Sequence, residues 1–557
     1  MSFSTLDTII FISYALLIVC IGLWVSRKRG KTSEDYFLAG KSLPWWAVGA
    51  SLIAANISAE QFIGMSGSGF AIGLAIASYE WMAAITLIIV GKYFLPIFIE
   101  KGLYTIPEFI EKRFSKSLKT ILAVFWIALF VFVNLTSVLY LGAIALDTIL
   151  GDGSGNIFMI SIFGLAIFAA AYSLYGGLSA VAWTDVLQVV LLLLGGIITT
   201  VVALQTVDPD GSFLGGIRTI YEKVPEKFSM ILEKGELITP NGKDAWWDLP
   251  GLAVLIGGLW VANLYYWGFN QYIIQRTLAA KSLKEAQKGI VLAAFLKLFL
   301  PLIVVTPGII AFVMNSGPSG VNLETADPSF LKAAGGVIND NAAPWLIKSF
   351  IPNGLKGLVL AALAAAIVSS LASMLNSTAT IFTMDIYKPY FGQQKSENHL
   401  VNVGRVTAAL ALMVAVVLAP QLKSLEQVFQ YIQEYTGVVS PGILAVFMLG
   451  LFWRKTTDKA AIWGVVLSIP IALYFKVGPN EWLESELFVT LPFMHQMMIT
   501  WILSSVLIMI ISWFETKGKD HEKGILISSQ LFKTSKSFNI NAWIIIVILI
   551  ALYWFFW

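Results

Sequence analysis

The chain has 557 residues, of which 57% are hydrophobic and only 13% are charged. A soluble globular protein carries about a quarter charged residues, so this chain cannot cover its surface against water and must face lipid. The net charge of +3, from 37 basic and 34 acidic residues, is too small and too dispersed to indicate a nucleic-acid partner.

The single cysteine, Cys20, excludes a disulfide within the chain and argues against a thiol-based metal site. The three histidines are too scattered in sequence to indicate a metal cluster. The first apolar run, from Thr8 to Val25, has no basic residue before it and ends in a basic stretch, 27–31. This pattern predicts a retained membrane helix with a cytoplasmic C-terminal end, rather than a cleaved signal peptide.

Runs long enough to cross a bilayer need about 20 apolar residues. We predict an all-α integral membrane protein with about fourteen transmembrane helices, near 8–26, 44–70, 77–99, 119–150, 157–174, 183–206, 250–274, 287–315, 354–386, 402–420, 425–452, 460–476, 491–513 and 541–557.

Basic residues fall on alternate short loops of this arrangement. Loops 27–43 and 101–119 hold five Lys or Arg residues each, whereas 71–78 and 151–156 hold none. The positive-inside rule then predicts a multi-pass protein of the cell (inner) membrane with both termini external. Loop 207–249, which we expect to contain short surface helices, lies outside as well.

Two spans are predicted to be interrupted. Span 2 carries four polar groups within 54–61, and span 7 carries a polar and aromatic stretch from Trp260 to Tyr272. Polar groups at that depth are tolerated around a cavity or a protein-lined site. The two spans are five apart, which favours a five-plus-five inverted repeat with a discontinuous first helix in each half.

The predicted organisation follows from these two halves. It comprises an extra N-terminal helix with a cytoplasmic loop (1–43), a first repeat (44–206), an external loop (207–249), a second repeat (250–452) and extra C-terminal helices (453–557).

Span 9 carries Ala366, Ser369 and Ser370 on one helical face, because they are spaced i, i+3, i+4. The two serine hydroxyls, together with backbone carbonyls from the broken span 2, would supply oxygen ligands for a weakly held Na⁺. The alternative is that the hydroxyls bond back to carbonyls one turn earlier.

Span 7 repeats the same spacing with Asn263, Tyr266 and Trp267. Aromatic faces and an amide suit a sugar, although aromatic residues in membrane helices often only pack or anchor at the interface.

Two charges are hardest to explain structurally. Lys297 lies well inside span 8, where an ammonium is unfavourable unless it is paired or hydrated, and Glu80 lies at the start of span 3, where it is either functional or an interface residue. Asp185 is expected in the first turn of span 6, where the helix dipole favours it whatever its function. Gln433, one turn beyond Phe429, is ambiguous alone.

Two longer stretches carry a family resemblance. The sequence GGLSAVAWTDVLQ at 176–188 resembles the signature of the sodium:solute symporter family, and NQYIIQRTLAAK at 270–281 resembles its second hallmark. The similarity runs from about Asp35 to the C-terminus and is greatest to the sodium/glucose cotransporter branch. It implies the fourteen-helix, five-plus-five architecture with alternating access, and Na⁺ as the coupling ion.

The resemblance also implies roles for individual residues. Sugar contacts would be Asn56, Gln61, Glu80, Asn263, Lys297 and Gln433, with Tyr266 as an inner gate over the sugar ring, supported by Trp267. An outer lid would consist of Met65, Tyr79 and Phe429. Sodium would be held by carbonyls of Ala54, Ile57 and Ala366 and hydroxyls of Ser369 and Ser370, and Asp185 would line the sodium exit.

Two positions depart from the family pattern. Ala83 stands where a galactose-transporting member has a serine sugar contact, so sugar preference is expected to differ. Ala55 stands where members with a second sodium site tend to have serine. Although Ser373 is present, we expect one sodium per cycle.

The sequence therefore predicts a sodium-coupled symporter of a neutral hexose, galactose or glucose, and no enzyme. The main alternative is a sodium symporter of another small solute such as proline or a carboxylate, although Glu80 disfavours an anion. A membrane sensor or channel with the same fold is a second alternative, for which a soluble signalling domain is expected. A membrane enzyme is least favoured, because no nucleophile, base and orienting group can be assembled.

Overall fold

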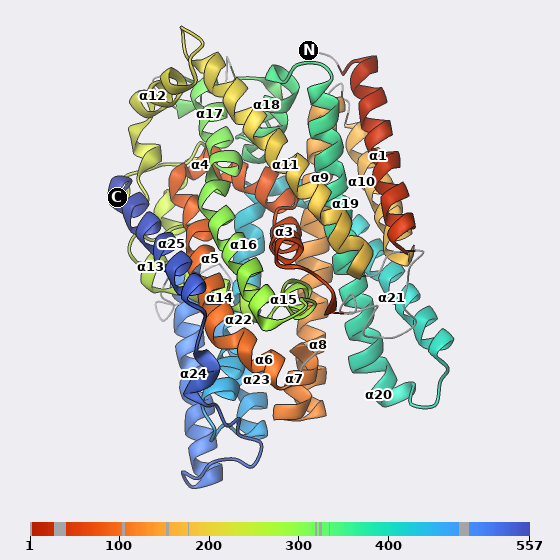
Figure 1. Ribbon diagram of the computed structural model, residues 1–557. Helices are drawn as coiled ribbons and strands as arrows, with labels where there is room; N and C mark the ends of the chain where they lie inside the picture. The colour runs from red at the N-terminus through yellow and green to blue at the C-terminus, as the bar shows by residue number, and fades with distance from the viewer. Residues whose placement is uncertain are drawn as a thin grey trace.

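The computed structural model describes residues 3–26, 41–102, 106–151, 155–175, 178–317, 320–321, 326–332, 335–477 and 490–557. These residues form a bundle of long helices (Figure 1). Within these ranges the only strands are two paired strands of two residues each, β1 (Ser316–Gly317) and β2 (Gly320–Val321). The all-α prediction is therefore correct in its essentials.

The first part of the bundle contains the helices up to residue 207. They are α1 (Thr5–Ser26), α3 (Trp45–Asn56), η2 (Glu60–Met65), α4 (Ser66–Ile72), η3 (Leu74–Ala77), α5 (Ser78–Ile89), η4 (Val90–Phe94), α6 (Leu95–Glu100), α7 (Ile106–Arg113), α8 (Lys116–Ala128), η5 (Leu129–Leu135), α9 (Thr136–Leu150), α10 (Asn156–Tyr175) and α11 (Leu178–Val207).

The segment that follows α11 holds three short helices, as predicted for loop 207–249. They are α12 (Phe213–Lys223), η6 (Pro225–Phe228) and η7 (Ala245–Trp247). The side chain of Lys227 in this segment donates to the carbonyls of Phe70 and Ala71 at the end of α4, at 2.9 and 3.0 Å. The loop is therefore fastened to the bundle.

The second part runs from residue 253 to 452. It contains α13 (Ala253–Ile256), α14 (Gly258–Phe269), α15 (Gln271–Leu278), α16 (Leu283–Val304), α17 (Thr306–Asn315), η8 (Pro328–Phe330), η9 (Asn339–Asn341), α18 (Ala342–Phe350), α19 (Leu355–Ile381), η10 (Phe382–Tyr387), α20 (Lys388–Phe391), α21 (Glu397–Leu418), η11 (Ala419–Ser424) and α22 (Val428–Phe452). The remaining helices are α23 (Asp458–Val477), α24 (Phe493–Thr516), η13 (Ser529–Phe532) and α25 (Lys536–Phe555).

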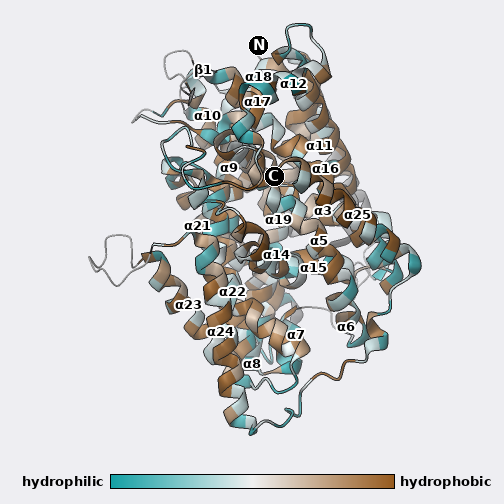
Figure 2. Ribbon diagram, turned by 90° about the vertical axis from the view of Figure 1, so that its left-hand side faces the viewer, coloured by the Kyte–Doolittle hydropathy of each residue, from teal (hydrophilic) through white to brown (hydrophobic). Residues whose placement is uncertain are grey.

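Ten helical runs within the described ranges are long and apolar enough to cross a membrane, and α1 and α10 contain shorter apolar stretches. Each predicted span overlaps one of the helices or broken helices above. Outer helices such as α23 and α24 are largely hydrophobic along their length (Figure 2). Their exposed side chains include Trp463, Phe514 and Trp513, as expected for a surface that faces lipid.

Both discontinuous helices are present, and the break in span 7 at Asn270 lies within the predicted stretch from Trp260 to Tyr272. In span 2, α3 ends at Asn56, and a π-helical turn begins at Glu60. In span 7, the stretch 258–269 is helical, and the chain is extended only at Asn270, with a further break at Gly257. Asn263 and Tyr266 therefore project from the intact helix α14, whereas Asn270 forms the break itself.

The prediction for Asp185 was wrong in one respect. Helix α11 begins by Leu178, seven residues before Asp185, so this residue lies beyond the first turn. The side chain of Asp185 lies outside the described residues. Its position gives no support to stabilisation by the helix dipole, which acts over the first turn only.

Both ends of the chain lie in the upper half of the bundle in the view of Figure 1. The Asp7 carboxylate accepts hydrogen bonds from the amides of Gly354 and Gly357 at the start of α19, at 2.7 and 2.8 Å. The Phe556 carbonyl accepts from the Met230 amide in the 207–249 segment. The upper half also carries α12, α17 and α18 (Figure 1).

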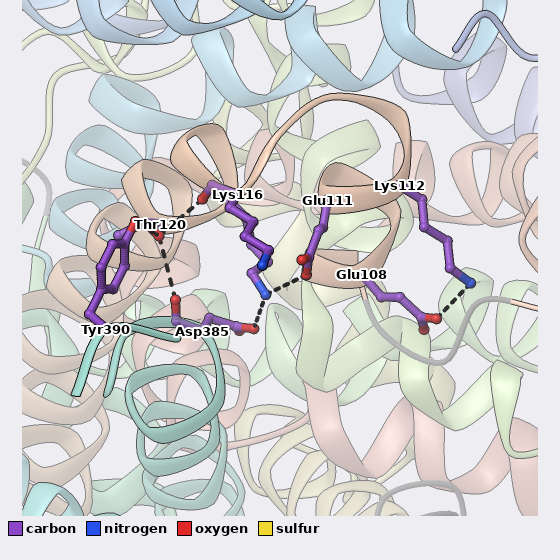
Figure 3. Close-up of polar contacts among 8 residues, drawn as sticks. Glu108, Glu111, Lys112, Lys116, Thr120, Asp385 and Tyr390 are labelled. Atoms are coloured by element: carbon purple, nitrogen blue, oxygen red, sulfur yellow. Dashed lines mark hydrogen bonds and ion pairs between the residues drawn. The ribbon is translucent and has the colours of Figure 1, made fainter. Parts of the chain in front are cut away.

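At the opposite end, one ion pair and a hydrogen bond connect the two halves. Lys119 on α8 contacts Glu111 at 2.6 Å and Asp385 on η10 at 3.4 Å. Thr120 lies 3.2 Å from the hydroxyl of Tyr390 on α20 (Figure 3). Because these side chains come from spans 4 and 9, the network connects the two predicted repeats.

Candidate substrate and sodium sites

A cavity of about 60 Å³ lies among helices of both halves of the bundle. Water-sized spaces need about 10–15 Å³ each, so the cavity has room for a few small polar groups. All eleven predicted sugar and gate residues line it: Asn56, Gln61, Met65, Tyr79, Glu80, Asn263, Tyr266, Trp267, Lys297, Phe429 and Gln433. Ala83, where the family pattern has serine, lines it as well.

Two opposite charges meet at the cavity. Lys297 Nζ on α16 lies 2.5 Å from Glu80 Oε2 on α5, and the two side chains are 1% and 3% exposed. The same ammonium donates to Asn56 Oδ1 at the end of α3. The Trp267 ring centroid lies 5.0 Å from the ammonium, within the range of a cation–π contact. The membrane lysine is therefore paired, as its depth requires.

A continuous chain of polar side chains extends from this pair. Asn56 Nδ2 donates to the Tyr266 hydroxyl at 3.3 Å, and the Tyr272 hydroxyl donates to the same oxygen at 2.9 Å. The break at Asn270 separates these two tyrosines. Five side chains from five helices thus form one network: Tyr272, Tyr266, Asn56, Lys297 and Glu80.

The predicted outer lid is packed over one side of the cavity. Tyr79 and Phe429 make an edge-to-face contact with ring centroids 5.1 Å apart. Met65 is fully buried, and Gly64 beside it lies so close to Phe429 that a Cβ atom there would be 3.3 Å from the Phe429 Cβ. The lid side of the cavity is closed by hydrophobic contacts.

The three predicted amides differ in their partners. Asn263 Nδ2 donates to the Leu259 carbonyl on its own helix at 3.1 Å. Gln61 Oε1 is buried and has no hydrogen-bond partner among the described residues. Gln433 on α22 is partly buried at the cavity. Buried amide groups normally have partners, so the Gln61 oxygen is available to a bound polar group.

The structure adds residues that the sequence reasoning did not assign. Glu60, next to Gln61, is buried, and Asn134 hydrogen-bonds its carboxyl group. Glu60 was visible in sequence as an acidic residue in the middle of span 2, whereas Asn134 gave no such signal. The complete set of additional lining residues is Glu60, Leu129, Asn134, Ala262, Tyr265, Asn270, Ile432 and Thr436.

The predicted sodium residues lie outside this cavity, on two helices that contact each other. Ala54 and Ile57 flank the end of α3, and Ala366, Ser369 and Ser370 are buried on α19. The Ser58 amide donates to the Asn56 carbonyl at 2.9 Å, instead of to the Ala54 carbonyl as in a continuous helix. The Ser370 hydroxyl is buried and has no partner within the described part of the chain. Oxygen atoms suited to a hard cation are therefore present.

The protein-family comparison identifies the chain on independent grounds. Residues 36–468 match the model of the sodium:solute symporter family. The chain is 60% identical to the sodium/glucose cotransporter of Vibrio parahaemolyticus over 557 residues, with 100% of this chain and 98% of the relative covered. It is 32% identical to the human sodium/myo-inositol cotransporter 2 over 532 residues, with coverages of 91% and 76%.

A structural comparison gives the same fold. A Na⁺-coupled sialic acid symporter, solved in a substrate-bound outward-open state, superposes with a TM-score of 0.74 at 22% identity. The match covers 95% of this chain and 100% of that structure. The polar network, the two broken helices and these matches agree: the chain belongs to the sodium:solute symporter family and is a sodium-coupled membrane transporter, not an enzyme.

Proposed function

We propose that this transporter couples the entry of Na⁺ to the uptake of a neutral hexose, glucose or galactose, by alternating access. The observation that carries the proposal is the buried Glu80–Lys297 pair with Asn56 at the cavity. The 60% identity to a sodium/glucose cotransporter supports the same substrate class.

The pair favours a neutral polyol over a charged solute. Its net charge is zero, so an anion or a cation bound there would leave one buried charge without compensation. A carboxylate only accepts hydrogen bonds and an ammonium only donates them, whereas a sugar hydroxyl does both. Adjacent hydroxyls can therefore enter between Glu80 and Lys297 and satisfy both groups, while Tyr266 and Trp267 cover the apolar face of the ring.

Coupling to sodium follows from the break in span 2. The proposed sodium carbonyls, Ala54 and Ile57, flank Asn56, which is the residue that contacts Lys297 and Tyr266. A Na⁺ ion held between these carbonyls and the hydroxyls of Ser369 and Ser370 would fix the backbone that positions Asn56. Sodium binding would then raise the affinity for sugar, and the reverse must hold by linkage.

The architecture that we propose has fourteen spans, with repeats at 44–206 and 250–452, extra helices at 1–43 and 453–557, and both termini outside. It is supported by the break at Ile57 near the start of the first half, and by the breaks at Gly257 and Asn270 near the start of the second half.

Membrane-impermeant cysteine labelling tests the orientation in a Cys20→Ser background. A cysteine at Glu236 should be labelled from outside intact cells, and one at Lys284 should be labelled only after the cells are opened. Labelling of the Lys284 position in sealed cells would reverse the topology.

Uptake into proteoliposomes tests the function. Radiolabelled glucose and galactose should accumulate under an inward Na⁺ gradient and fail to accumulate when K⁺ replaces Na⁺. Sodium-driven uptake of proline or a carboxylate, without hexose uptake, would support the alternative solute class. Accumulation driven by a pH gradient without sodium would contradict the coupling ion.

A further inference from the structure

A second cavity, which shares no lining residue with the first, lies at the surface between α16, α3 and α25. Its volume is about 580 Å³. It is lined by Trp45, Lys284, Gln287, Lys288, Val291, Leu292, Phe295, Ser535, Ser537, Phe538, Asn541, Ile544 and Ile545. We refer to it as the α16–α25 groove. From its composition we propose that it binds an anionic phospholipid of the membrane leaflet at this end of the bundle.

The groove exists because two of its three helices are packed tightly and the third is not. Gly49 on α3 and Gly289 on α16 face each other so closely that a Cβ atom on either would come within 2.8 Å of the opposite backbone. Helix α25 contacts α16, and Phe538 and Ile545 of α25 are buried. A furrow remains between α25 and the two glycine-packed helices.

The groove residues on α16 change from basic to apolar along one face of the helix. Lys284, Lys288, Val291, Leu292 and Phe295 recur at i, i+4, i+7, i+8 and i+11, which places them on one face. The two lysines lie in the first two turns of α16, near the membrane–water boundary. The apolar residues follow towards the membrane interior. Phe299 and Leu302 continue the exposed apolar surface in the same direction, at 49% and 57% exposure.

The α25 wall repeats this order. Ser535 caps the N-terminus of α25, and Ser537 lies in its first turn. Phe538 and Asn541 follow, and then Ile544 and Ile545. Both helices therefore present polar groups at the same end of the groove and apolar groups at the other. This gradient matches the headgroup and acyl chains of one lipid molecule.

The polar end has positive charge available for a phosphate. Lys288 is 48% exposed and is paired at 3.2 Å with Glu285, whose other oxygen accepts from the Trp45 amide at 2.9 Å. Lys284 is exposed and forms no ion pair with any side chain that the structure describes. The charge of Lys288 is thus only partly neutralised, and the charge of Lys284 is not neutralised by an ion pair with a described residue. Trp45, 39% exposed at the rim, is a residue type that favours the headgroup level.

An anionic headgroup fits this arrangement better than a zwitterionic one. Juxtamembrane lysines attract anionic lipid by about 1 kcal/mol each, whereas a choline headgroup would bring a cation towards Lys284 and Lys288. A membrane helix of another protein would cover the apolar half of the groove but would leave the lysines without partners. The charge at the polar end therefore selects phosphatidylglycerol or a similar lipid.

Native mass spectrometry of the full-length, delipidated protein tests the proposal. The protein is mixed with equal amounts of phosphatidylglycerol and phosphatidylcholine of identical chain length. Wild type should retain phosphatidylglycerol preferentially, and Lys284→Gln with Lys288→Gln should weaken this retention about 30-fold, or about fivefold for each lysine. Both side chains are exposed, so the variant should elute as a folded, monodisperse species.

Two control variants define the site. Lys459→Gln with Lys519→Gln removes two exposed lysines outside the groove and should leave lipid retention unchanged. Lys284→Arg with Lys288→Arg keeps the charge and should retain phosphatidylglycerol. Glycerol 3-phosphate, which has the headgroup charge without acyl chains, should not displace the lipid.

Three results would overturn the proposal. They are equal retention of both lipids by wild type, an unchanged preference in the Lys284/Lys288 glutamine variant, and displacement of phosphatidylglycerol by glycerol 3-phosphate at comparable concentration.

Discussion

Lys297 Nζ lies 2.5 Å from Glu80 Oε2, and this ion pair joins α16 of the second half to α5 of the first half at the wall of the central cavity. Asn56, at the broken end of α3, bonds to the same ammonium. The proposed sugar site and the proposed sodium site therefore share one helix break. Four sets of substitutions test separate parts of the structure, beginning with this pair.

Glu80→Gln and Lys297→Ala should each strongly reduce sodium-driven hexose uptake. A hydrogen bond to a charged group contributes about 1.5–3 kcal/mol, so the loss of one should weaken sugar binding by about one to two powers of ten. Initial uptake rates in proteoliposomes, normalised to the amount of folded protein, measure the effect. Normal hexose transport by both variants would show that the pair is structural.

Ser370→Ala should raise the sodium concentration required for half-maximal uptake. The reason is that its buried hydroxyl is one of the proposed sodium ligands and has no partner among the described residues. Sugar affinity at saturating sodium should change less. Thr378→Val is the matched control, because the Thr378 hydroxyl on the same helix already bonds back to the Met374 carbonyl at 2.8 Å. An identical sodium dependence of Ser370→Ala and wild type would remove Ser370 from the site.

Lys119→Ala should lower the thermal stability of the transporter more than Asp385→Asn does. Lys119 is 9% exposed and contacts both Glu111 and Asp385, so its removal leaves two carboxylates facing each other (Figure 3). The asparagine variant retains the 2.6 Å pair with Glu111. Lys112→Ala, which breaks the more exposed pair with Glu108, should change the unfolding temperature little. Equal effects of the three variants would contradict a role for this network in joining the halves.

Asp340 should make stability depend on pH. Burial raises the pKa of its carboxyl group to about 7, although the Val428 amide donates to it and Lys332 lies nearby. The folded state therefore binds more protons than the unfolded chain between about pH 4 and 7, and the stabilisation present at the lower pH is lost as pH rises through 7.

The comparison with Asp340→Asn isolates this effect. The variant should unfold at a higher temperature than wild type at pH 8, and the difference should shrink as the pH falls towards 5. A constant difference across this range would show that Asp340 does not titrate near neutrality. Lys332→Gln should raise the pKa further, because it removes the positive charge that favours the carboxylate.

Much of the fold and the candidate site follows from local sequence patterns. Long apolar runs predict helices because the bilayer leaves few alternatives, and a lone Lys297 in such a run indicates a partner. The family resemblance added Asn56 and the lid residues, which composition alone would not have selected.

Other features depend on packing between distant segments. The polar stretch 260–272 predicts an interruption of span 7, but its exact position at Asn270 does not follow from the local pattern. The same is true of Asn134 beside Glu60, and of the α16–α25 groove, whose walls are about 250 residues apart in sequence.

Direct measurement of sugar binding to purified protein tests the central claim most closely. In saturating Na⁺, a panel of hexoses each lacking one hydroxyl is titrated against wild type, Glu80→Gln and Lys297→Ala. One deoxy sugar should lose about one to two powers of ten in affinity for wild type and lose little further in the matching variant, because the same hydrogen bond is already absent. Strictly additive losses for every deoxy sugar and variant, or tighter binding of an amino acid than of any hexose, would contradict the proposal that Glu80 and Lys297 bind a neutral sugar.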